Sequence, residues 1–600
     1  VSFDEYWNNY TYTRSNTSTA FFDREDQAPY FSEYVRLLLE TEYLLGSSNI
    51  NKDGYEIYTT LNLDYQAAAE EEMRAGISRA NARYQANTER RVTYAEEQFA
   101  PIVDLMSLTF DLPEMHVANA KLREQALETY QESINPLLDV VSLMLGSSEQ
   151  DEIRHATRMA YAKADDEAKR TTVEGALITI ENDTGYILAM IGGNRFEQRN
   201  QFNRAVDARV EPGSAFKPLY YSSAIENGVI TPATMLYDAH VVFWNDDGTP
   251  YTPLNYKGEW EGPVLARHAL AHSMNIPSLR ILNRVGFSDA LETAASLLGI
   301  PERNMVSRNL VRRFPVGLGI VEVAPIEMAQ AFATFPNGGR RVTPLSVRYI
   351  KDRDGRIIAE PERELRERQL SNSEEEQLLS PQTAYIMTDM LQSTVTSGTL
   401  RYAASTVGGF DMPTGGKTGT TQNWSDAWTV GFTPYVTTAI WFGFDRGGSN
   451  SLGTDQTGAT TTGPVWARYM KAIHEGLPPR EFEEPGEGLV RVEVSRQTGL
   501  LPTENFSGQV IEEIFIAGTQ PQQFDQRYEF EREQEDRLVD RLRQDLATRD
   551  LGLQSLETAT TPSRSAEPLE FRLDFELPEE EDGALEFGDP EEEESNPLLD

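Results

Sequence analysis

The 600-residue sequence contains no cysteine. Disulfide bonds and metal sites built on thiolates are therefore excluded. It also has no run of about 18 apolar residues, which is the length that a membrane-spanning helix requires, and it shows no secretion signal. Because the first residue is Val1 and not methionine, we expect a processed or excised piece whose membrane anchor lies upstream.

Basic residues are scarce relative to acidic ones, with 54 Lys and Arg against 95 Asp and Glu, for a net charge of −41. Residues 561–600 contribute 15 acids and 2 arginines to this excess. An acidic surface repels phosphates, which argues against a nucleic-acid partner and leaves solubility as the simplest role of the charge. Hydrophobic residues make up 39 % of the chain, enough for a sizeable core. The length predicts about three or four domains.

Periodic patterns predict the structure of the first part of the chain. Residues 30–45 carry apolar side chains at helical spacing, and residues 54–63 alternate as in a strand. Asp64 is a plausible N-cap for a helix over 67–84. We therefore expect residues 1–84 to form an N-terminal linker region.

The stretch 85–170 is charged and poor in strand formers, which predicts a helical insertion or satellite domain. His116 and His155 are its only imidazoles, and their spacing does not fit metal ligands. We expect both to be ordinary surface or core residues, so no metal site is predicted.

The residue pattern changes from helical to strand-like at Gly175. Two strand-like segments, 176–180 and 186–191, flank a turn and predict a hairpin. Later strands near 425–445 and the helices between them indicate an α+β domain with an antiparallel sheet over 171–522. Residues 523–600 predict a charged helix followed by a disordered acidic tail.

Three short motifs occur in order along this α+β region. The second begins 59 residues after the first, and the third begins 203 residues after it. Each motif is weak alone, but the ordered set is the one typical of penicillin-binding proteins and β-lactamases. The motifs are Ser214-Ala-Phe-Lys217, Ser273-Met-Asn275 and Lys417-Thr418-Gly419 followed by Thr420.

The first motif suits nucleophilic catalysis. A serine hydroxyl needs a base, and Lys217 lies three residues on, on the same face of a helix. Pro212 and Gly213 fit a turn into a helix N-terminus, whose N–H groups favour an oxyanion. Lys217 acts as a base only when neutral, so burial or another cation, with Lys417 as the obvious candidate, must lower its pKa.

The sequence does not match the motifs of phosphate-binding loops, of Gly-x-Ser-x-Gly hydrolases or of His-Glu-x-x-His metalloproteases. Position 411 is Asp, so Lys417 does not end a phosphate-binding loop, and Pro212 excludes a Gly-x-Ser-x-Gly elbow. No His-Glu-x-x-His is present. His272 adjoins Ser273 and offers a Ser–His alternative, but it leaves the lysines of the three motifs unused.

The chain resembles the class A, or bifunctional, penicillin-binding proteins over roughly residues 25–80 and 172–520. It resembles the region that follows their glycosyltransferase domain, which this sequence does not contain, so polymerase activity is not carried over and that domain is expected upstream. The stretch 85–170 and the tail after 525 are unusual for the family. Beyond the motifs, the resembling segments are 28–35, 58–64, 176–193, 202–205, 211–218, 317–335 and 337–339.

The resemblance implies a penicillin-binding-protein/β-lactamase-like transpeptidase fold and a peptidoglycan D,D-transpeptidase that works through an acyl-serine. It implies Ser214 as nucleophile and Lys217 as base, with the proton route left open. It further implies that Ser273 relays a proton and that Asn275 orients Lys217 and binds the substrate amide. The third motif would hold the terminal carboxylate, and the N–H groups of Ser214 and Thr420 would form the oxyanion hole. The implied catalytic residues are Ser214, Lys217, Ser273, Asn275 and Lys417, and the implied substrate-binding residues are Thr418, Gly419 and Thr420.

The same resemblance implies partners and location. Stem peptides would serve as D-Ala-D-Ala donor and amine acceptor, β-lactams would acylate Ser214, and no metal or cofactor would be needed. The site would lie on the periplasmic or extracytoplasmic face of the inner membrane, and envelope regulatory proteins are possible partners of 85–170 or the tail. A D,D-carboxypeptidase or β-lactamase using the same residues, and a non-catalytic penicillin-binding scaffold, stay open as alternatives.

Overall fold

The computed structural model describes residues 26–41, 54–110, 172–196, 200–255, 258–421, 424–445, 451–453, 455–504, 506–527, 537–539 and 541, with the backbone alone for 87–110. The chain divides into two units, Val1–Gln526 and Arg527–Asp600. Only five residues of the second unit are described, and they are helical. The expected acidic tail and most of the expected insertion lie outside the described residues.

A five-stranded antiparallel sheet forms the centre of the first unit, with strand order β10-β11-β12-β2-β3. This confirms the predicted hairpin and the antiparallel sheet, and it shows that β12 pairs with β2. Apolar and β-branched residues dominate β2, β3, β11 and β12, as a doubly covered sheet requires, whereas the edge strand β10 is rich in glycine. The strands are β2 (Glu174–Glu181), β3 (Ile187–Ile191), β10 (Gly415–Thr420), β11 (Ala427–Phe432) and β12 (Val436–Gly443).

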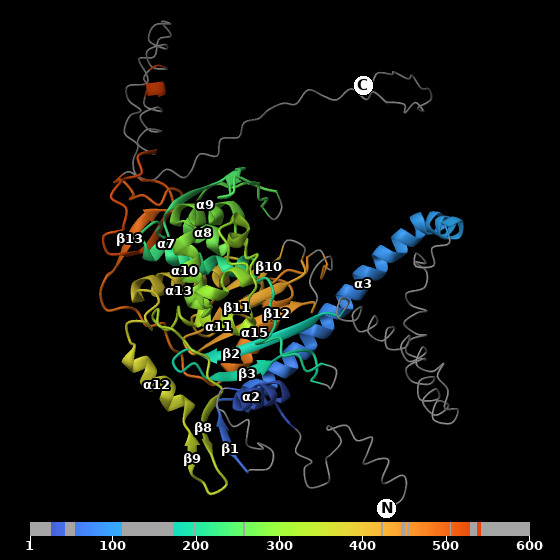
Figure 1. The fold of residues 1–600 in the computed structure, drawn as a ribbon. Helices are drawn as coiled ribbons and strands as arrows, with labels where there is room; N and C mark the ends of the chain where they lie inside the picture. The colour runs from blue at the N-terminus through green and yellow to red at the C-terminus, as the bar shows by residue number, and fades with distance from the viewer. Residues whose placement is uncertain are drawn as a thin grey trace, which may run out of the picture. The chain divides into compact units, whose positions relative to one another are not determined.

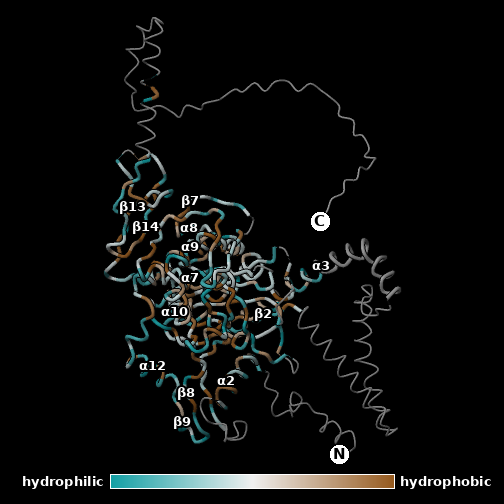
Figure 2. Tube along the Cα trace, turned by 45° about the horizontal axis from the view of Figure 1, so that its top comes forward, coloured by the Kyte–Doolittle hydropathy of each residue, from teal (hydrophilic) through white to brown (hydrophobic). Residues whose placement is uncertain are grey.

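Helices cover both faces of this sheet, which confirms the α+β class (Figure 1). Because side chains alternate along a strand, Ile178 packs into one core and Leu177 into the other. The helix α11 (Pro325–Ala333) lies on the first face, while α3 (Leu63–Phe110) and α15 (Thr462–Ile473) lie on the second. Figure 2 shows the apolar residues gathered in the interior of the unit.

A group of helices forms a helical subdomain beside β10. Helix α13 contacts β10 directly, α7 packs against α9 and α10, and α8 packs against α13. These helices are α7 (Lys217–Glu226), α8 (Ala266–Ala271), α9 (Asn275–Val285), α10 (Phe287–Leu298) and α13 (Pro381–Thr396). The remaining elements used below are the short helices η6 (Gly213–Phe216), η9 (Phe314–Leu318) and α14 (Arg401–Ser405).

The N-terminal elements follow the predicted order with two corrections. Strand β1 (Glu56–Thr59) pairs with β8 (Val347–Lys351), which in turn pairs with β9 (Ile357–Ala359). The prediction of Asp64 as N-cap is wrong, because Asn62 Oδ1 accepts from the N–H groups of Asp64 at 3.0 Å and Tyr65 at 3.2 Å. The second correction concerns the helix predicted over 67–84, because α3 begins at Leu63 and continues to Phe110.

Two hydrogen bonds join α3 to the residue that directly precedes β2. Asn81 Nδ2 donates to Val173 O at 2.7 Å, and Val173 N donates to Asn81 Oδ1 at 2.9 Å. The two residues are 92 positions apart. This reciprocal pair fixes the exit of α3 beside the start of β2.

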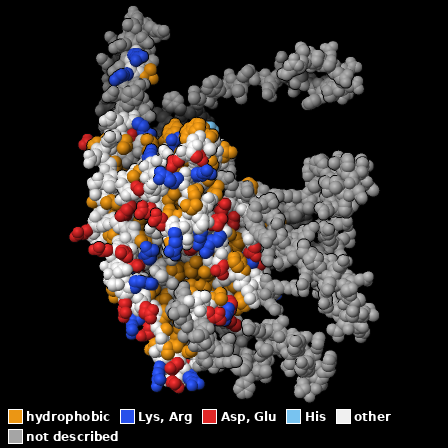
Figure 3. All heavy atoms as spheres, in the orientation of Figure 1, with side chains coloured by type: hydrophobic (Ala, Val, Ile, Leu, Met, Phe, Trp, Pro, Cys, Tyr) orange, Lys and Arg blue, Asp and Glu red, His pale blue; other side chains and the backbone are white. Residues whose placement is uncertain are grey.

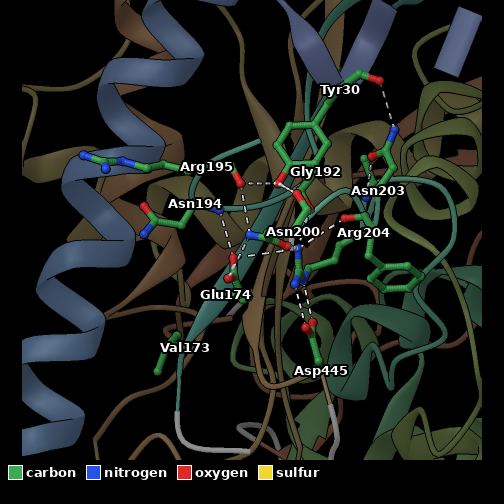
Figure 4. A network of polar contacts seen from close by, with 12 residues as sticks. Tyr30, Val173, Glu174, Gly192, Asn194, Arg195, Asn200, Asn203, Arg204 and Asp445 are labelled. Atoms are coloured by element: carbon green, nitrogen blue, oxygen red, sulfur yellow. Dashed lines mark hydrogen bonds and ion pairs between the residues drawn. The ribbon is translucent and has the colours of Figure 1, made fainter. Parts of the chain in front are cut away.

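Helix α2 (Pro29–Thr41) is joined to the sheet by a buried polar network (Figure 4). Arg204 is 2 % exposed, and its Nη2 donates to Asp445 Oδ2 at 2.6 Å while Nη1 lies 3.8 Å from Glu174 Oε2. Tyr30 OH donates to Arg195 O at 3.0 Å. The network therefore binds the N-terminal helix to both β2 and the end of β12.

A second buried ion pair joins the C-terminal strands β13 (Leu489–Ser495) and β14 (Val510–Ile516) to the helical subdomain. Glu513 of β14 is fully buried, and Arg267 Nε of α8 donates to its Oε2 at 2.8 Å. Arg267 also pairs with Asp389 of α13. None of the described helices is long and apolar enough to cross a lipid bilayer.

Candidate active site

Ser214 lies in the turn that leads into α7. Pro212 and Gly213 do lead into a helix, but the first turn is the 3₁₀ helix η6, and α7 begins only at Lys217. In a 3₁₀ turn residues i and i+3 stand one above the other, so Lys217 lies over Ser214, and its N–H bonds to Ser214 O. Ser214 is half-buried, and its hydroxyl makes no hydrogen bond to another described residue.

Backbone packing fixes this turn from two sides. Gly213 has φ +54°, and a Cβ there would lie 2.6 Å from Thr420 O of β10. Gly319, which ends η9 with φ +78°, allows Gly213 O to approach so closely that a Cβ would lie 2.0 Å from it. Trp428 Nε1 donates to Glu211 O at 2.9 Å, so the residue before the turn is held by β11. The position of Ser214 therefore depends on glycines that no side chain can replace without movement.

Lys217 reaches the second motif. Its Nζ donates to Ser273 O at 2.7 Å, Met274 O at 3.2 Å and Asn275 Oδ1 at 2.9 Å. Asn275 Nδ2 in turn donates to Leu254 O at 3.0 Å, which fixes the orientation of the amide. All three donor positions of a protonated Lys217 are thus directed at one turn of the chain.

Ser273 links the two lysines of the site. It lies between α8 and α9 with φ +59°, a left-handed conformation that is rare for a residue other than glycine. This turn directs its carbonyl to Lys217 and its hydroxyl to Lys417, whose Nζ donates to Ser273 Oγ at 2.8 Å. One residue therefore contacts both ammonium groups, through opposite ends.

The third motif occupies β10. Because side chains alternate along a strand, Thr418 and Thr420 share one face and Lys417 takes the other. Thr418 Oγ1 donates to Thr399 Oγ1 at 2.9 Å, and Thr420 Oγ1 accepts from Gly458 N at 3.0 Å. A Cβ at Gly419 would lie 2.0 Å from Pro212 O, so this glycine permits β10 to lie against the nucleophile turn.

Burial makes both lysines easier to deprotonate. Lys217 and Lys417 are fully buried. Burial lowers the pKa of Lys417 to about 7. Burial, and then the positive charge of Lys417, lowers the pKa of Lys217 well below its ordinary range. Burial therefore shifts the pKa of both lysines in the direction that a lysine base requires.

The alternative candidate at His272 finds no support in the geometry. His272 is only partly exposed, and its ring lies 4.2 Å, centroid to centroid, from that of His268. Burial of the ring, and then the charge of His268, lowers its pKa. Across the part of the chain that the structure describes, no cluster of three or more His, Asp or Glu side chains suits a metal ion.

Several residues around the site belong to no sequence motif, so the sequence did not predict them as site residues. Thr399, which follows α13, contacts Thr418, and its N–H bonds to Ala271 O at 3.1 Å. Leu254 O receives the amide of Asn275, and Gly458 N binds Thr420. Only a fold places these positions next to the motifs, because their distance along the chain bears no relation to the site.

Comparison with known families agrees with this geometry. Residues 175–445 match the penicillin binding protein transpeptidase domain, and residues 485–530 match the C-terminal domain of penicillin-binding protein 1A. The chain is a class A penicillin-binding-protein relative. The first match contains all three motifs and the central sheet, and the second contains β13 and β14.

Individual relatives give the same assignment. The chain is 35 % identical to penicillin-binding protein 1A of Aquifex aeolicus over 58 % of its own length and 44 % of that protein. It is 30 % identical to penicillin-binding protein 1A of Neisseria gonorrhoeae over 78 % of its length and 58 % of that protein. The chain thus spans about half the length of the curated relatives it matches.

Solved structures confirm the fold. Penicillin-binding protein 1A of Haemophilus influenzae superposes with a TM-score of 0.60 at 20 % identity, covering 83 % of this chain and 77 % of that one. The penicillin-binding protein PonA1 of Mycobacterium tuberculosis gives 0.51 at 18 % identity, covering 80 % and 98 %. The predicted transpeptidase fold is therefore confirmed.

Proposed function

We propose that the chain is a serine-type D,D-transpeptidase that cross-links peptidoglycan stem peptides. The observation that carries the proposal is the contact of Ser273 with both buried lysines, next to the turn that holds Ser214. The Ser273 hydroxyl contacts Lys417 and its carbonyl contacts Lys217, so two lysines of lowered pKa flank one residue and can carry protons without a histidine, metal or cofactor.

In the acylation step, Ser214 Oγ attacks the carbonyl of the penultimate D-alanine of a donor peptide. Its proton passes to neutral Lys217, and the N–H groups of Ser214 and Thr420 stabilise the oxyanion. The C–N bond then breaks, and Ser273 passes a proton from Lys217 or Lys417 to the leaving amine of the terminal D-alanine. An acyl-Ser214 ester remains.

In the transfer step, the amine of a second stem peptide attacks this ester. The amine loses a proton to the lysine pair, a new peptide bond forms, and the Ser214 hydroxyl is restored with that proton. The step therefore balances without water. Attack by water instead would give the carboxypeptidase or β-lactamase alternative.

Substrate binding is assigned to the third motif on β10. Lys417, Thr418 and Thr420 hold the terminal carboxylate of the donor, and Gly419 lets β10 approach the nucleophile turn. Asn275 binds the substrate amide once Nδ2 leaves Leu254 O. This chemistry belongs to the periplasmic or extracytoplasmic side, where the peptide substrate is.

Support for β-lactam binding comes from a structural neighbour. A structure of PonA1 of Mycobacterium tuberculosis in complex with penicillin V superposes with a TM-score of 0.50 at 20 % identity. We propose that penicillins acylate Ser214 in the same chemical manner as the donor peptide, with opening of the lactam in place of loss of D-alanine.

The decisive experiment is intact-mass analysis after incubation with penicillin, followed by mapping of the modified peptide. We expect one stable adduct on Ser214, and none in Ser214→Ala. Ser222→Ala, which removes a buried hydroxyl elsewhere on α7, is the matched control and should label normally.

Each other outcome has a definite meaning. An adduct that survives in Ser214→Ala refutes the nucleophile. Rapid loss of the adduct with release of opened penicillin indicates a β-lactamase, and release of D-alanine without cross-linking in the presence of an acceptor amine indicates a carboxypeptidase. No adduct in the folded wild type indicates a non-catalytic scaffold.

A further inference from the structure

A small cleft lies on the second face of the sheet, away from the Ser214 turn, where α3 packs against α15. Its volume is about 190 Å³. Arginine and hydroxyl side chains from α3, α14, α15 and the loop 456–461 line it. The principal ones are Arg79, Arg83, Arg468, Tyr402, Thr406 and Thr461.

The arginines of this cleft carry more positive charge than the described residues neutralise. Arg79 and Arg83 are four residues apart on α3, so their like charges face each other. Arg468 of α15 pairs with Glu72, with Nε 2.6 Å from Oε2, and this is the one ion pair that the three arginines form among the described residues. Within the described part of the chain, these three guanidiniums and one carboxylate leave a net charge of about +2, in a protein whose overall charge is −41.

The arginines also have unused donors. Arg468 Nη2 is buried and has no hydrogen-bond partner among the described residues, which costs free energy. Arg83 Nη1 makes only a long contact of 3.4 Å with Gln456 Oε1. Burial, and then the charge of Arg468, holds the pKa of Arg79 below its ordinary value. An anion in the cleft would supply an acceptor for the Arg83 guanidinium, and it would favour the charged form of Arg79.

The arrangement favours a phosphate group over a carboxylate. A carboxylate offers two oxygens in one plane, whereas a phosphate offers three or more oxygens in a tetrahedral array. Guanidiniums on two different helices, α3 and α15, can bind different oxygens of a tetrahedral phosphate, because each presents its own pair of N–H donors. The residual charge of about +2 would also balance the charge of about −2 on a phosphate dianion.

The cleft is connected to the active-site strand through the loop 456–461. Gln456 Oε1 accepts from Arg83 and from Thr461 Oγ1 at 3.1 Å. Two residues on, Gly458 N donates to Thr420 Oγ1 at 3.0 Å, and a Cβ at Gly458 would lie 2.5 Å from Gly419 O. The loop therefore contacts the cleft at one end and the third motif at the other.

We propose that this arginine cleft binds a phosphate group and that the bound phosphate stabilises the loop 456–461 against Thr420. Binding at the cleft does not depend on the proposed transpeptidase activity. The effect on the active site does rest on that proposed function, so the two are measured separately.

Binding is tested by thermal unfolding of the full chain in inorganic phosphate against chloride at constant ionic strength. The variant is Arg79→Ala/Arg83→Ala. The control is Arg353→Ala/Arg356→Ala, which removes the same charge at the β8–β9 turn, away from α15 (Figure 1). On the face drawn in Figure 3, basic and acidic side chains are interspersed, so a control for general charge effects is needed.

We expect phosphate to raise the unfolding temperature of the wild type and of the control, and to leave the cleft variant unshifted. A second arm measures co-sedimentation with vesicles of phosphatidylglycerol, which carry the phosphate on a lipid. Binding of vesicles that the cleft variant loses assigns the phosphate to a lipid headgroup, and a shift with inorganic phosphate alone assigns it to a free anion. Equal behaviour of all three proteins in both arms overturns the proposal.

The link to the active site is tested by the rate of acylation with a fluorescent penicillin. Phosphate, or the vesicles if they bind, should change that rate in the wild type and control by at least twofold and leave it unchanged in the cleft variant. An unchanged rate in a wild type that binds phosphate overturns the coupling. If the wild type forms no adduct at all, the proposed function fails, while the unfolding experiment still decides the cleft.

Discussion

Replacing Lys417 with methionine should stabilise the protein near neutral pH and destabilise it in alkali. Burial lowers the pKa of Lys417 from its ordinary 10.5 to about 7. At about 1.4 kcal/mol for each tenfold change in proton affinity, this lowering corresponds to roughly 5 kcal/mol of folding free energy. Methionine has a similar length and avoids that cost.

The sign follows from proton binding in the two states. Between about pH 7 and pH 10.5 the unfolded chain keeps the proton of Lys417 and the folded chain has lost it, so the stability of the wild type rises with pH. The penalty is complete below about pH 7 and disappears as the pH approaches 10.5. Methionine does not titrate, so the difference between the two proteins isolates this one group, together with its effect on Lys217.

The substitution also removes the bonds from Lys417 Nζ to Ser273 Oγ and to Thr418 O. Their loss costs about 2–3 kcal/mol in total. Lys417→Met should therefore be more stable than the wild type by about 2 kcal/mol near pH 6 and less stable by about 1–2 kcal/mol near pH 10. Penicillin acylation should be lost at every pH.

Urea unfolding followed by tryptophan fluorescence measures this difference, because Trp428, Trp441 and Trp466 are buried around the sheet. The control is Lys471→Met, which removes a lysine whose Nζ faces Asp411 at the surface and should change stability by less than about 1 kcal/mol. A Lys417→Met difference that stays constant from about pH 6 to pH 10 would refute the assignment of the lowered pKa.

Two further predictions concern the support of the site. Gly319→Ala should lower the rate of penicillin acylation on the order of a hundredfold, because its Cβ would displace Gly213 O and with it Ser214. Gly338→Ala, at φ +61° but with open space around it, carries only the backbone cost and should acylate at nearly the wild-type rate; equal losses would contradict the steric argument. Glu513→Ala should lower the free energy of unfolding by about 3–5 kcal/mol in urea, because it leaves Arg267 with an unfilled partner position in the interior. Glu484→Ala, which breaks a half-exposed pair with Arg491, should cost less than about 1 kcal/mol, and a similar cost for both would show that Glu513 is not a buried anchor.

The sequence predicts the parts of the fold that local pattern determines. The hairpin of β2 and β3 follows from apolar segments around a turn, and the motif residues follow from side-chain chemistry at fixed spacing. Lys217 falls beside Ser214 because only three residues separate them. The structure then brings Lys217, Ser273, Asn275 and Lys417 into one hydrogen-bonded group, whose catalytic roles stay predictions until acylation is measured.

Tertiary geometry determines what the sequence could not reveal. Asn62 replaces Asp64 as the cap because α3 begins earlier than its apolar pattern suggests. Thr399 meets Thr418 only because α13 lies on β10, and Arg267 meets Glu513 across 246 positions. Such contacts depend on how elements pack, and neither spacing nor composition records them. The predicted limits of the insertion, of the 171–522 domain and of the tail stay predictions.

The paired hydrogen bonds between Asn81 and Val173 have a consequence for chain topology. They bring the two ends of a long excursion, residues 82–172, to one point on the domain, so both ends are already joined by the fold. The entropy of closing a loop grows only with the logarithm of its length, by about 0.6 kcal/mol for each doubling. Segments of very different length and sequence can therefore be exchanged at this point at small thermodynamic cost, while the sheet and the lysine pair stay as they are.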